Sequence, residues 1–176
     1  MMKRVSILAA LFLMIVIRSE AVHAEQLVAK EEALKAAFTV KFLNFVIFPE
    51  KQEETRLCVY ASSEIQEVFK NFENTSQRLR RIKVVFPEKV EEAHTCHVVY
   101  FSSSVKAELR SLLRTVEGRP TLTVSDMSEF CNKGGMIELD KSQAKLKFDV
   151  NLSKARKSGL SIRSGLLSLA RKVIQD

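Results

Sequence analysis

The sequence predicts an α/β fold: a single layered domain whose partly parallel, mixed sheet is flanked by helices and ends in an antiparallel hairpin. Three observations predict it. Short apolar runs alternate with amphipathic segments through most of the chain. A strand that ends in serines and leads into a helix occurs twice, at residues 57–72 and 98–116. Two later apolar runs, at 136–139 and 145–150, are separated by a short polar turn. Alternating strands and helices favour parallel pairing, and the two later runs favour a hairpin.

Residues 1–24 predict an export signal. Lys3 and Arg4 precede an apolar run over residues 5–17, which is shorter than the roughly 20 residues of a bilayer span. Polar and then small residues follow, as in a signal peptide, and we expect cleavage after Ala24. An uncleaved membrane anchor is the alternative. No second hydrophobic span follows, so residues 25–176 are expected to form a single domain that does not cross the membrane.

The charge of the mature chain is modest. The leader contains three of the 28 basic and one of the 21 acidic residues, which leaves a net charge of +5. Such a charge favours acidic partners or surfaces. The basic residues are scattered, apart from short clusters such as residues 78–81, and they do not alternate with aromatic residues. We therefore expect no binding to nucleic acid.

The mature chain begins with a predicted helix over residues 26–48. Its apolar residues recur at steps of four, four and three: Leu34, Phe38, Phe42 and Phe45. Pro49 ends the helix, because a proline disfavours helical geometry in the residue before it.

Three predicted strands follow. Residues 57–61 form a buried strand, and the serines after it can cap a helix that carries Ile65, Val68, Phe69 and Phe72. Residues 82–86 alternate in polarity and end at Pro87. Residues 98–101 again end in serines, and the next helix extends to Val116.

Cys58 and Cys96 open the two similar strands, and in an exported chain they predict a structural disulfide. Neighbouring strands lie about 4.8 Å apart, within the Cα separation of about 4.4–6.8 Å that a disulfide needs. The pairing fits if these two strands are adjacent, with residues 82–86 outside them, as in flavodoxin-like sheets. Both cysteines are expected at the amino-terminal starts of their strands.

The third cysteine, Cys131, is left over. It could be a buried thiol, an alternative disulfide partner or a link to another chain. The absence of a Cys-x-x-Cys pair weakens a role in disulfide exchange. His94, Cys96 and His97 do not have the paired spacing of a zinc site, so no metal or cofactor is expected.

The serines after the two strands are candidates for binding a small ligand. Ser62, Ser63, Ser102 and Ser103 are expected at the carboxyl edge of the sheet, where open α/β sheets bind ligands. They lack a Gly-x-Ser-x-Gly motif, so no catalytic residue is predicted among them. Helix caps are the simpler interpretation.

The last third contains predicted strands at residues 121–124, 136–139 and 145–150. The second and third form the hairpin, with a turn at residues 140–142. A closing amphipathic helix is expected from its apolar spacing: Ile162, Leu166, Leu169, Ala170 and Val173.

Here the chain resembles the YfiR family, exported bacterial proteins that regulate cyclic-di-GMP signalling from the periplasm. The matching segments are GRPTLTVSD at 118–126, GGMI at 134–137, FDVNL at 148–152, SGLSI at 158–162 and LLSLA at 166–170. KAAF at 35–38 and NF at 44–45 are similar to its first helix. The chain departs from the family at Phe48, which is usually Trp, and at Cys131, which lacks the nearby partner cysteine of some members.

The resemblance implies a non-enzymatic repressor that binds the periplasmic sensor domain of an inner-membrane diguanylate cyclase. It also implies a structural disulfide between Cys58 and Cys96, release of repression under redox or envelope stress, and a homodimer. Two other functions are kept open: a periplasmic receptor for a small ligand at the serine-capped strand ends, and an envelope enzyme using Cys131 or the histidines.

Overall fold

The computed structural model describes residues 26–73, 81–140 and 145–175, so the predicted signal peptide lies outside the described residues. A mixed seven-stranded sheet forms the centre, with the strand order β3-β2-β4-β5-β6-β7-β9. Its strands are β2 (Glu54–Tyr60), β3 (Arg81–Val85), β4 (Val98–Phe101), β5 (Leu122–Ser125), β6 (Ile137–Asp140), β7 (Lys147–Asn151) and β9 (Lys172–Ile174).

The five strands from β3 to β6 are parallel, and β7 is antiparallel to β6. The predicted α/β class, the outer position of β3 beside β2, and the hairpin of β6 and β7 are therefore confirmed. Most of the predicted hairpin turn lies outside the described residues, which end at 140 and resume at 145.

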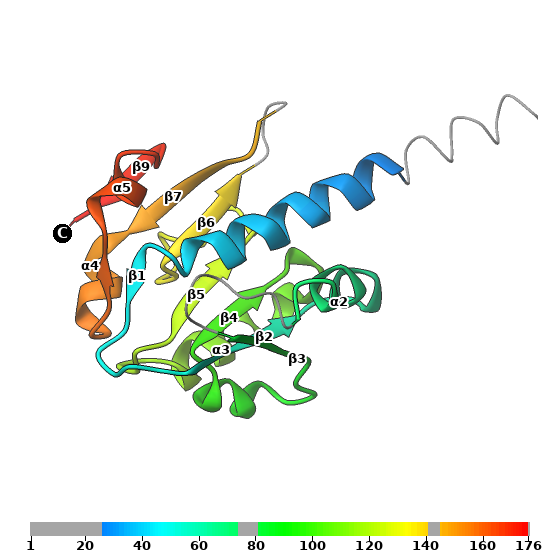
Figure 1. Ribbon diagram of the computed structural model, residues 1–176, viewed down its shortest axis with the longest axis horizontal. Coiled ribbons are helices and arrows are strands. Elements are labelled where there is room, and N and C mark those ends of the chain that lie inside the picture. The colour runs from blue at the N-terminus through cyan, green and yellow to red at the C-terminus, as the bar shows by residue number, and fades with distance from the viewer. Residues whose placement is uncertain (1–25, 74–80, 141–144, 176) are drawn as a thin grey trace, which may run out of the picture.

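Helices cover both faces of the sheet (Figure 1). One face packs against a helix over residues 26–42, α2 (Ser63–Lys70), α4 (Leu152–Lys157) and α5 (Ser164–Leu167). The other face packs against the 3₁₀ segments η1 (Val90–Thr95) and η2 (Ser103–Glu108) and the helix α3 (Leu109–Thr115). None of the described helices is long and apolar enough to cross a membrane.

Side-chain alternation along the central strands separates two apolar clusters. Leu57 and Val59 of β2 belong to the cluster under the N-terminal helix, whereas Cys58 and Tyr60 belong to the cluster under α3. This follows from the period of two in a strand, where successive side chains point to opposite faces. Because both faces are covered, the central strands are apolar on both sides.

The N-terminal helix ends at residue 42, earlier than the predicted residue 48. After a turn, β1 (Val46–Ile47) pairs antiparallel with β8 (Ser161–Ile162) in a small second sheet. Arg163 N donates to Phe45 O at 2.9 Å beside this pair. Val46 and Phe48 are buried there. Pairing with a segment more than 100 residues away therefore overrides the local helical spacing.

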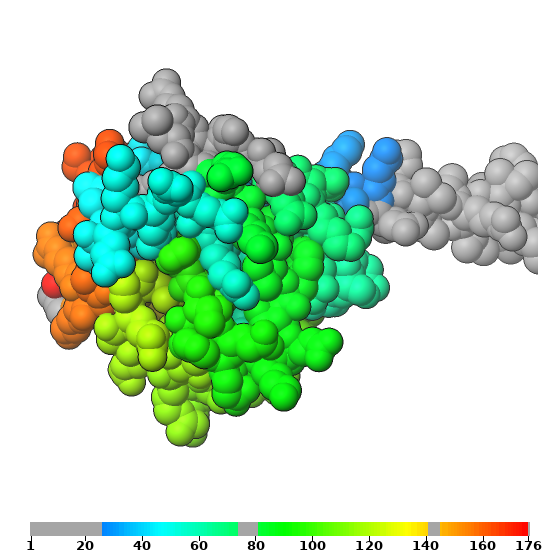
Figure 2. Space-filling model, turned by 60° about the horizontal axis from the view of Figure 1, so that its bottom comes forward, coloured from blue at the N-terminus to red at the C-terminus, as the bar shows by residue number. Residues whose placement is uncertain are grey.

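The segment that follows β1 packs beside the segment that precedes β4. Figure 2 shows the two in contact, the first in cyan and the second in green. The ring of Phe48 lies 6.4 Å from that of His97, and His97 N donates to Arg56 O. These contacts close the amino-terminal edge of the parallel strands.

The predicted closing helix is wrong. The chain forms β8, the short helix α5 and β9, which pairs parallel with β7. Gly159 has a φ of 78°, a conformation that ends α4 and turns the chain into β8. Arg171 N donates to Phe148 O, which starts the pairing of β9. Of the apolar residues that suggested one helix, Ile162 lies in β8, Leu166 in α5 and Val173 in β9, and the other two lie between α5 and β9.

The structure requires glycine at positions 134 and 135 for two different reasons. Gly134 has a φ of 97°, which residues with a Cβ rarely adopt. Gly135 lies against the ring of the fully buried Phe130, and a Cβ on Gly135 would lie 2.1 Å from that ring. The tight approach holds the loop before β6 against the sheet.

We expect Gly135→Ala to lower the free energy of unfolding by about 2 kcal/mol, because the Phe130 ring must move within a packed core. Urea unfolding measures this. Gly165→Ala is the matched control, since its nearest contact, to the Phe45 ring, is an ordinary 3.5 Å. Equal effects of the two substitutions would contradict the conclusion that the Phe130 ring leaves no room for a Cβ at position 135.

Candidate functional site

A disulfide joins Cys58 and Cys96, whose Cα atoms lie 5.9 Å apart. The two strands that carry or follow these cysteines, β2 and β4, are adjacent, and Cys58 is in register with Val99. Cys96 precedes β4, as expected. Cys58 does not lie at the start of its strand, because β2 begins at Glu54, four residues earlier. Because residues 53–56 are polar and mostly charged, the sequence pattern did not indicate that the strand begins before residue 57.

The disulfide belongs to the interior of the protein. Cys58 is completely buried and Cys96 is 3% exposed. Both pack in the apolar cluster beneath η1 and α3, together with Ala93, Val99 and Leu112. The bond therefore links the second layer of helices to the sheet, away from the carboxyl ends of the strands.

The remaining cysteine, Cys131, is a buried thiol in the loop before β6. Its Sγ donates weakly to the carbonyl oxygens of Met136 and Asp149, both at 3.6 Å. Burial, with the nearby carboxylates of Glu138 and Asp149, raises the pKa of the thiol to about 12. A thiol that stays protonated at neutral pH is a poor nucleophile, which argues against Cys131 as the nucleophile of the enzymatic alternative.

We expect Cys131 to be unreactive in the folded protein. At about pH 8, a chromogenic disulfide reagent should label no thiol until the protein is unfolded, and then one thiol per chain. Because the folded pKa lies above the usual 9.0, this thiol also makes stability fall as the pH rises from 9 towards 12. Cys131→Ala is the control, and rapid labelling of native wild type would contradict the prediction.

The four candidate serines do lie at the carboxyl ends of β2 and β4. The Ser62 N–H donates to the hydroxyl of Ser104 at 3.1 Å, which joins the two ends. The Ser102 hydroxyl accepts from Ser104 N at 3.2 Å and caps η2. The Ser63 hydroxyl donates to Glu64. These hydrogen bonds give three of the four serines structural roles.

Ser103 leads to a charged cluster that the sequence analysis did not identify. Its N–H donates to Asp126 Oδ1 at 2.7 Å, and its hydroxyl contacts Oδ2 at 3.3 Å. Asp126, after β5, also accepts from Lys35 Nζ at 2.8 Å. Lys35 belongs to the N-terminal helix and pairs with Glu31 and Glu32 as well. The cluster fixes the N-terminal helix to the carboxyl edge of the sheet.

The cluster is largely withdrawn from water. The side chains of Lys35 and Asp126 are 9% and 6% exposed. Burial alone would lower the pKa of Lys35, but hydrogen bonds to Asp126 and Glu32 outweigh it and raise that pKa above 10.5. Lys35 is therefore charged at neutral pH, and its charge is compensated by three carboxylates.

A hollow of about 510 Å³ opens beside this cluster. Lys35, Asp126, Glu138, Asp140 and Arg171 contribute to its walls, and none of the four candidate serines does. Arg171 is held by Asp140 and by both oxygens of Asp149. The polar hollow at the carboxyl edge of the sheet therefore lies beside β5 and β6, and not at the serines that follow β2 and β4.

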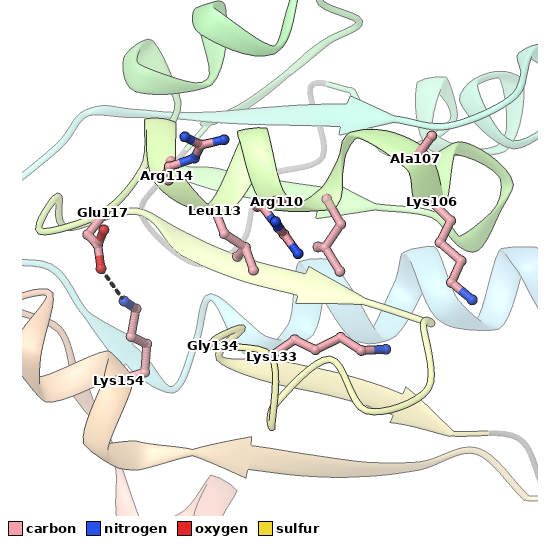
Figure 3. Close-up of a pocket in the computed structure, with 10 residues that line it drawn as sticks. Lys106, Ala107, Arg110, Leu113, Arg114, Glu117, Lys133, Gly134 and Lys154 are labelled. Carbon is pink, nitrogen blue, oxygen red and sulfur yellow. Dashed lines mark hydrogen bonds and ion pairs between the residues drawn. The ribbon is translucent and has the colours of Figure 1, made fainter.

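A larger, basic groove of about 750 Å³ lies on the α3 side of the sheet (Figure 3). Lys106, Arg110 and Arg114 follow one another along one wall. Lys133 and Lys154 lie on the opposite side, where Lys154 pairs with Glu117 at 3.2 Å. The four-residue spacing of Lys106, Arg110 and Arg114 was a signal in the sequence for one basic stripe.

Within the described ranges, no group of three His, Cys, Asp or Glu side chains could hold a metal ion.

Comparisons with solved structures support the fold. A conserved domain protein from Vibrio cholerae matches with a TM-score of 0.57 and 14% identity, over 81% of this chain and 60% of that one. The ABC domain in complex with L-Trp from Streptococcus pneumonia matches with a TM-score of 0.51 and 12% identity, over 69% and 55%. The chain thus spans less than two thirds of each structure, and at these identities the likeness concerns the fold alone.

Comparison with protein families gives a direct assignment. Residues 32–171 match the sequence model of the YfiR/HmsC-like family, from the middle of the N-terminal helix to the start of β9. The match includes the disulfide, the Lys35–Asp126 pair and the basic groove. The chain therefore belongs to the YfiR/HmsC-like family.

Proposed function

We propose that this chain is a periplasmic, non-enzymatic repressor of cyclic-di-GMP signalling. It binds the periplasmic sensor domain of an inner-membrane diguanylate cyclase and lowers the output of the cyclase. The observation that carries this proposal is the family match over residues 32–171, because members of this family regulate cyclic-di-GMP signalling from the periplasm. A homodimer is part of the same proposal.

Two further features agree with this function. The buried disulfide suits an oxidising compartment. The only free cysteine among the described residues is buried, and its raised pKa makes it a poor nucleophile.

Deletion of the gene tests the proposal. We expect cyclic-di-GMP to rise in the deletion strain and to return to its original level when the full chain is restored. A version that begins at residue 25, without the predicted leader, should not restore it, because it would remain on the wrong side of the membrane. No rise on deletion, or full restoration by the leaderless version, would count against a periplasmic repressor.

A second function is favoured by the hollow beside Lys35 and Asp126, which lies at the ligand-binding edge of an open sheet. A receptor for a small polar ligand would use Lys35 and Arg171 for recognition. Thermal-shift screening of the purified protein against small polar metabolites tests this alternative. Binding that is lost in Arg171→Gln and does not need the cyclase would favour a receptor.

A further inference from the structure

The basic groove carries more positive charge than its own surroundings neutralise. Five of its lining side chains are basic and one is acidic: Lys106, Arg110, Arg114, Lys133, Lys154 and Glu117. Glu117 already forms an ion pair with Lys154. Of the acidic side chains in the described ranges, none pairs with Lys106, Arg110 or Arg114, and all three of these are exposed. Uncompensated like charges on two facing walls favour an anionic occupant.

The groove has an elongated arrangement. Arg110 and Arg114 are one turn of α3 apart, a rise of about 6 Å, and Lys106 continues the row in η2. Lys133, held by the carbonyl of Ser128 at 3.0 Å, faces this row from the loop before β6. Leu113 is half-buried between the charged side chains. The cations therefore line two walls with an apolar strip between them, and they do not converge on one point.

We infer that this groove binds an acidic segment of a protein partner in an extended conformation. Successive side chains of an extended segment point to opposite sides, so carboxylates can reach the basic walls while apolar side chains contact Leu113. A single small anion would use only part of the row. A membrane surface is flat and would meet protruding basic residues more readily than a groove. Charge complementarity of this kind accelerates and orients association.

The binding of an acidic segment does not require that the partner be a cyclase. Assigning the segment to the cyclase's sensor domain rests on the function proposed above. The experiments below separate the two.

Fluorescence anisotropy of the purified protein tests the groove. The probe is a labelled peptide of alternating glutamate and leucine, with a glutamate and serine peptide for comparison. We expect the first peptide to bind more tightly, and its binding to weaken as ionic strength rises to about 0.15 M. The triple variant K106E/R110E/R114E should lose at least about tenfold in affinity.

The matched control K41E/K51E/K83E makes the same change of charge at exposed positions outside the groove. It should bind nearly as well as wild type. Equal losses in both triple variants would overturn the proposal, because only net charge would then matter. Binding to phosphatidylglycerol vesicles through these residues, without peptide binding, would also overturn it in favour of a membrane. Arg114→Gln gives a milder test of the same site, with an expected loss of affinity, if the triple variant does not fold.

Complementation in the deletion strain connects the groove to the proposed function. K106E/R110E/R114E should fail to lower cyclic-di-GMP, whereas K41E/K51E/K83E should restore the wild-type level. If the wild-type chain itself has no effect on cyclic-di-GMP, the repressor function fails, and peptide binding still decides whether the groove is a docking site. Full repression by a variant that has lost peptide binding would separate the groove from the cyclase.

Discussion

Replacing Cys58 and Cys96 together with alanine is expected to lower the free energy of unfolding by about 4 kcal/mol. The disulfide joins residues 38 positions apart, so its loss frees a long loop in the unfolded chain. The alanines also remove two buried sulfur atoms from the cluster beneath α3. Since an ordinary domain is stable by about 5–15 kcal/mol, this is a large share of the total. Urea unfolding of the oxidised wild type and the double variant measures it.

The same double variant links stability to regulation. If repression depends on the folded protein, the variant should lose repression as the temperature rises, and cyclic-di-GMP should increase. Cys131→Ala is the control, because it leaves the disulfide intact. A double variant as stable and as repressive as wild type would show that the disulfide neither holds the fold nor controls the output.

Burial of the bond also predicts how it responds to a reductant. Cys58 and Cys96 are 0% and 3% exposed, so a reductant reaches the sulfur atoms only when η1 and α3 open. Reduction should therefore be slow in native conditions and should accelerate in mild urea. Reduction of the folded protein as fast as that of a small exposed disulfide would contradict this. Opening of η1 and α3 would thus precede reduction of the bond.

Lys35→Met is expected to lower the free energy of unfolding by about 3 kcal/mol. The substitution keeps most of the apolar length of the side chain but leaves the buried carboxylate of Asp126 without its cationic partner. Because the pKa of Lys35 is raised above 10.5 in the folded state, its contribution is present at neutral pH and declines only above pH 10.5. Hydrogen exchange of residues 26–42 should show that the N-terminal helix becomes less protected.

Lys30→Met is the matched control, because Lys30 lies on the same helix and is exposed. It should change stability by less than about 0.5 kcal/mol. Asp126→Asn should reproduce much of the loss, and its combination with Lys35→Met should be less harmful than the sum of the two. Strict additivity, or equal effects at Lys30 and Lys35, would contradict the contribution of this cluster.

Local sequence patterns were sufficient for the parallel half of the sheet. Residues 98–101 were predicted as a strand and form β4 with those bounds. A short continuous apolar run between polar segments is typical of a parallel strand that is buried on both faces. The hairpin of β6 and β7 was equally clear from its polar turn. The pattern failed where an element depends on a distant partner, as in β1 and β8.

The sequence identified those site residues that depend on local patterns and missed those that come together from distant segments. The sequence identified the serines at the strand ends, and they lie at the expected edge, where the Ser102 hydroxyl caps η2. It did not identify Lys35 and Asp126 as a pair, because 91 residues separate them and neither has an unusual neighbourhood in sequence. It also did not assemble the basic groove, whose walls come from η2, α3, α4 and the loop before β6.

The sequence by itself determined the α/β class, the order β3-β2-β4 at one edge of the sheet and the resemblance to a family, because these depend on local periodicity and on short motifs. Only the tertiary structure decided that the last residues form β9 instead of a helix, that Lys35 holds the N-terminal helix to the sheet, and that scattered basic residues face one another. Each of these depends on which distant segments meet, and packing and pairing energies between distant segments outweigh the small local preferences of the chain.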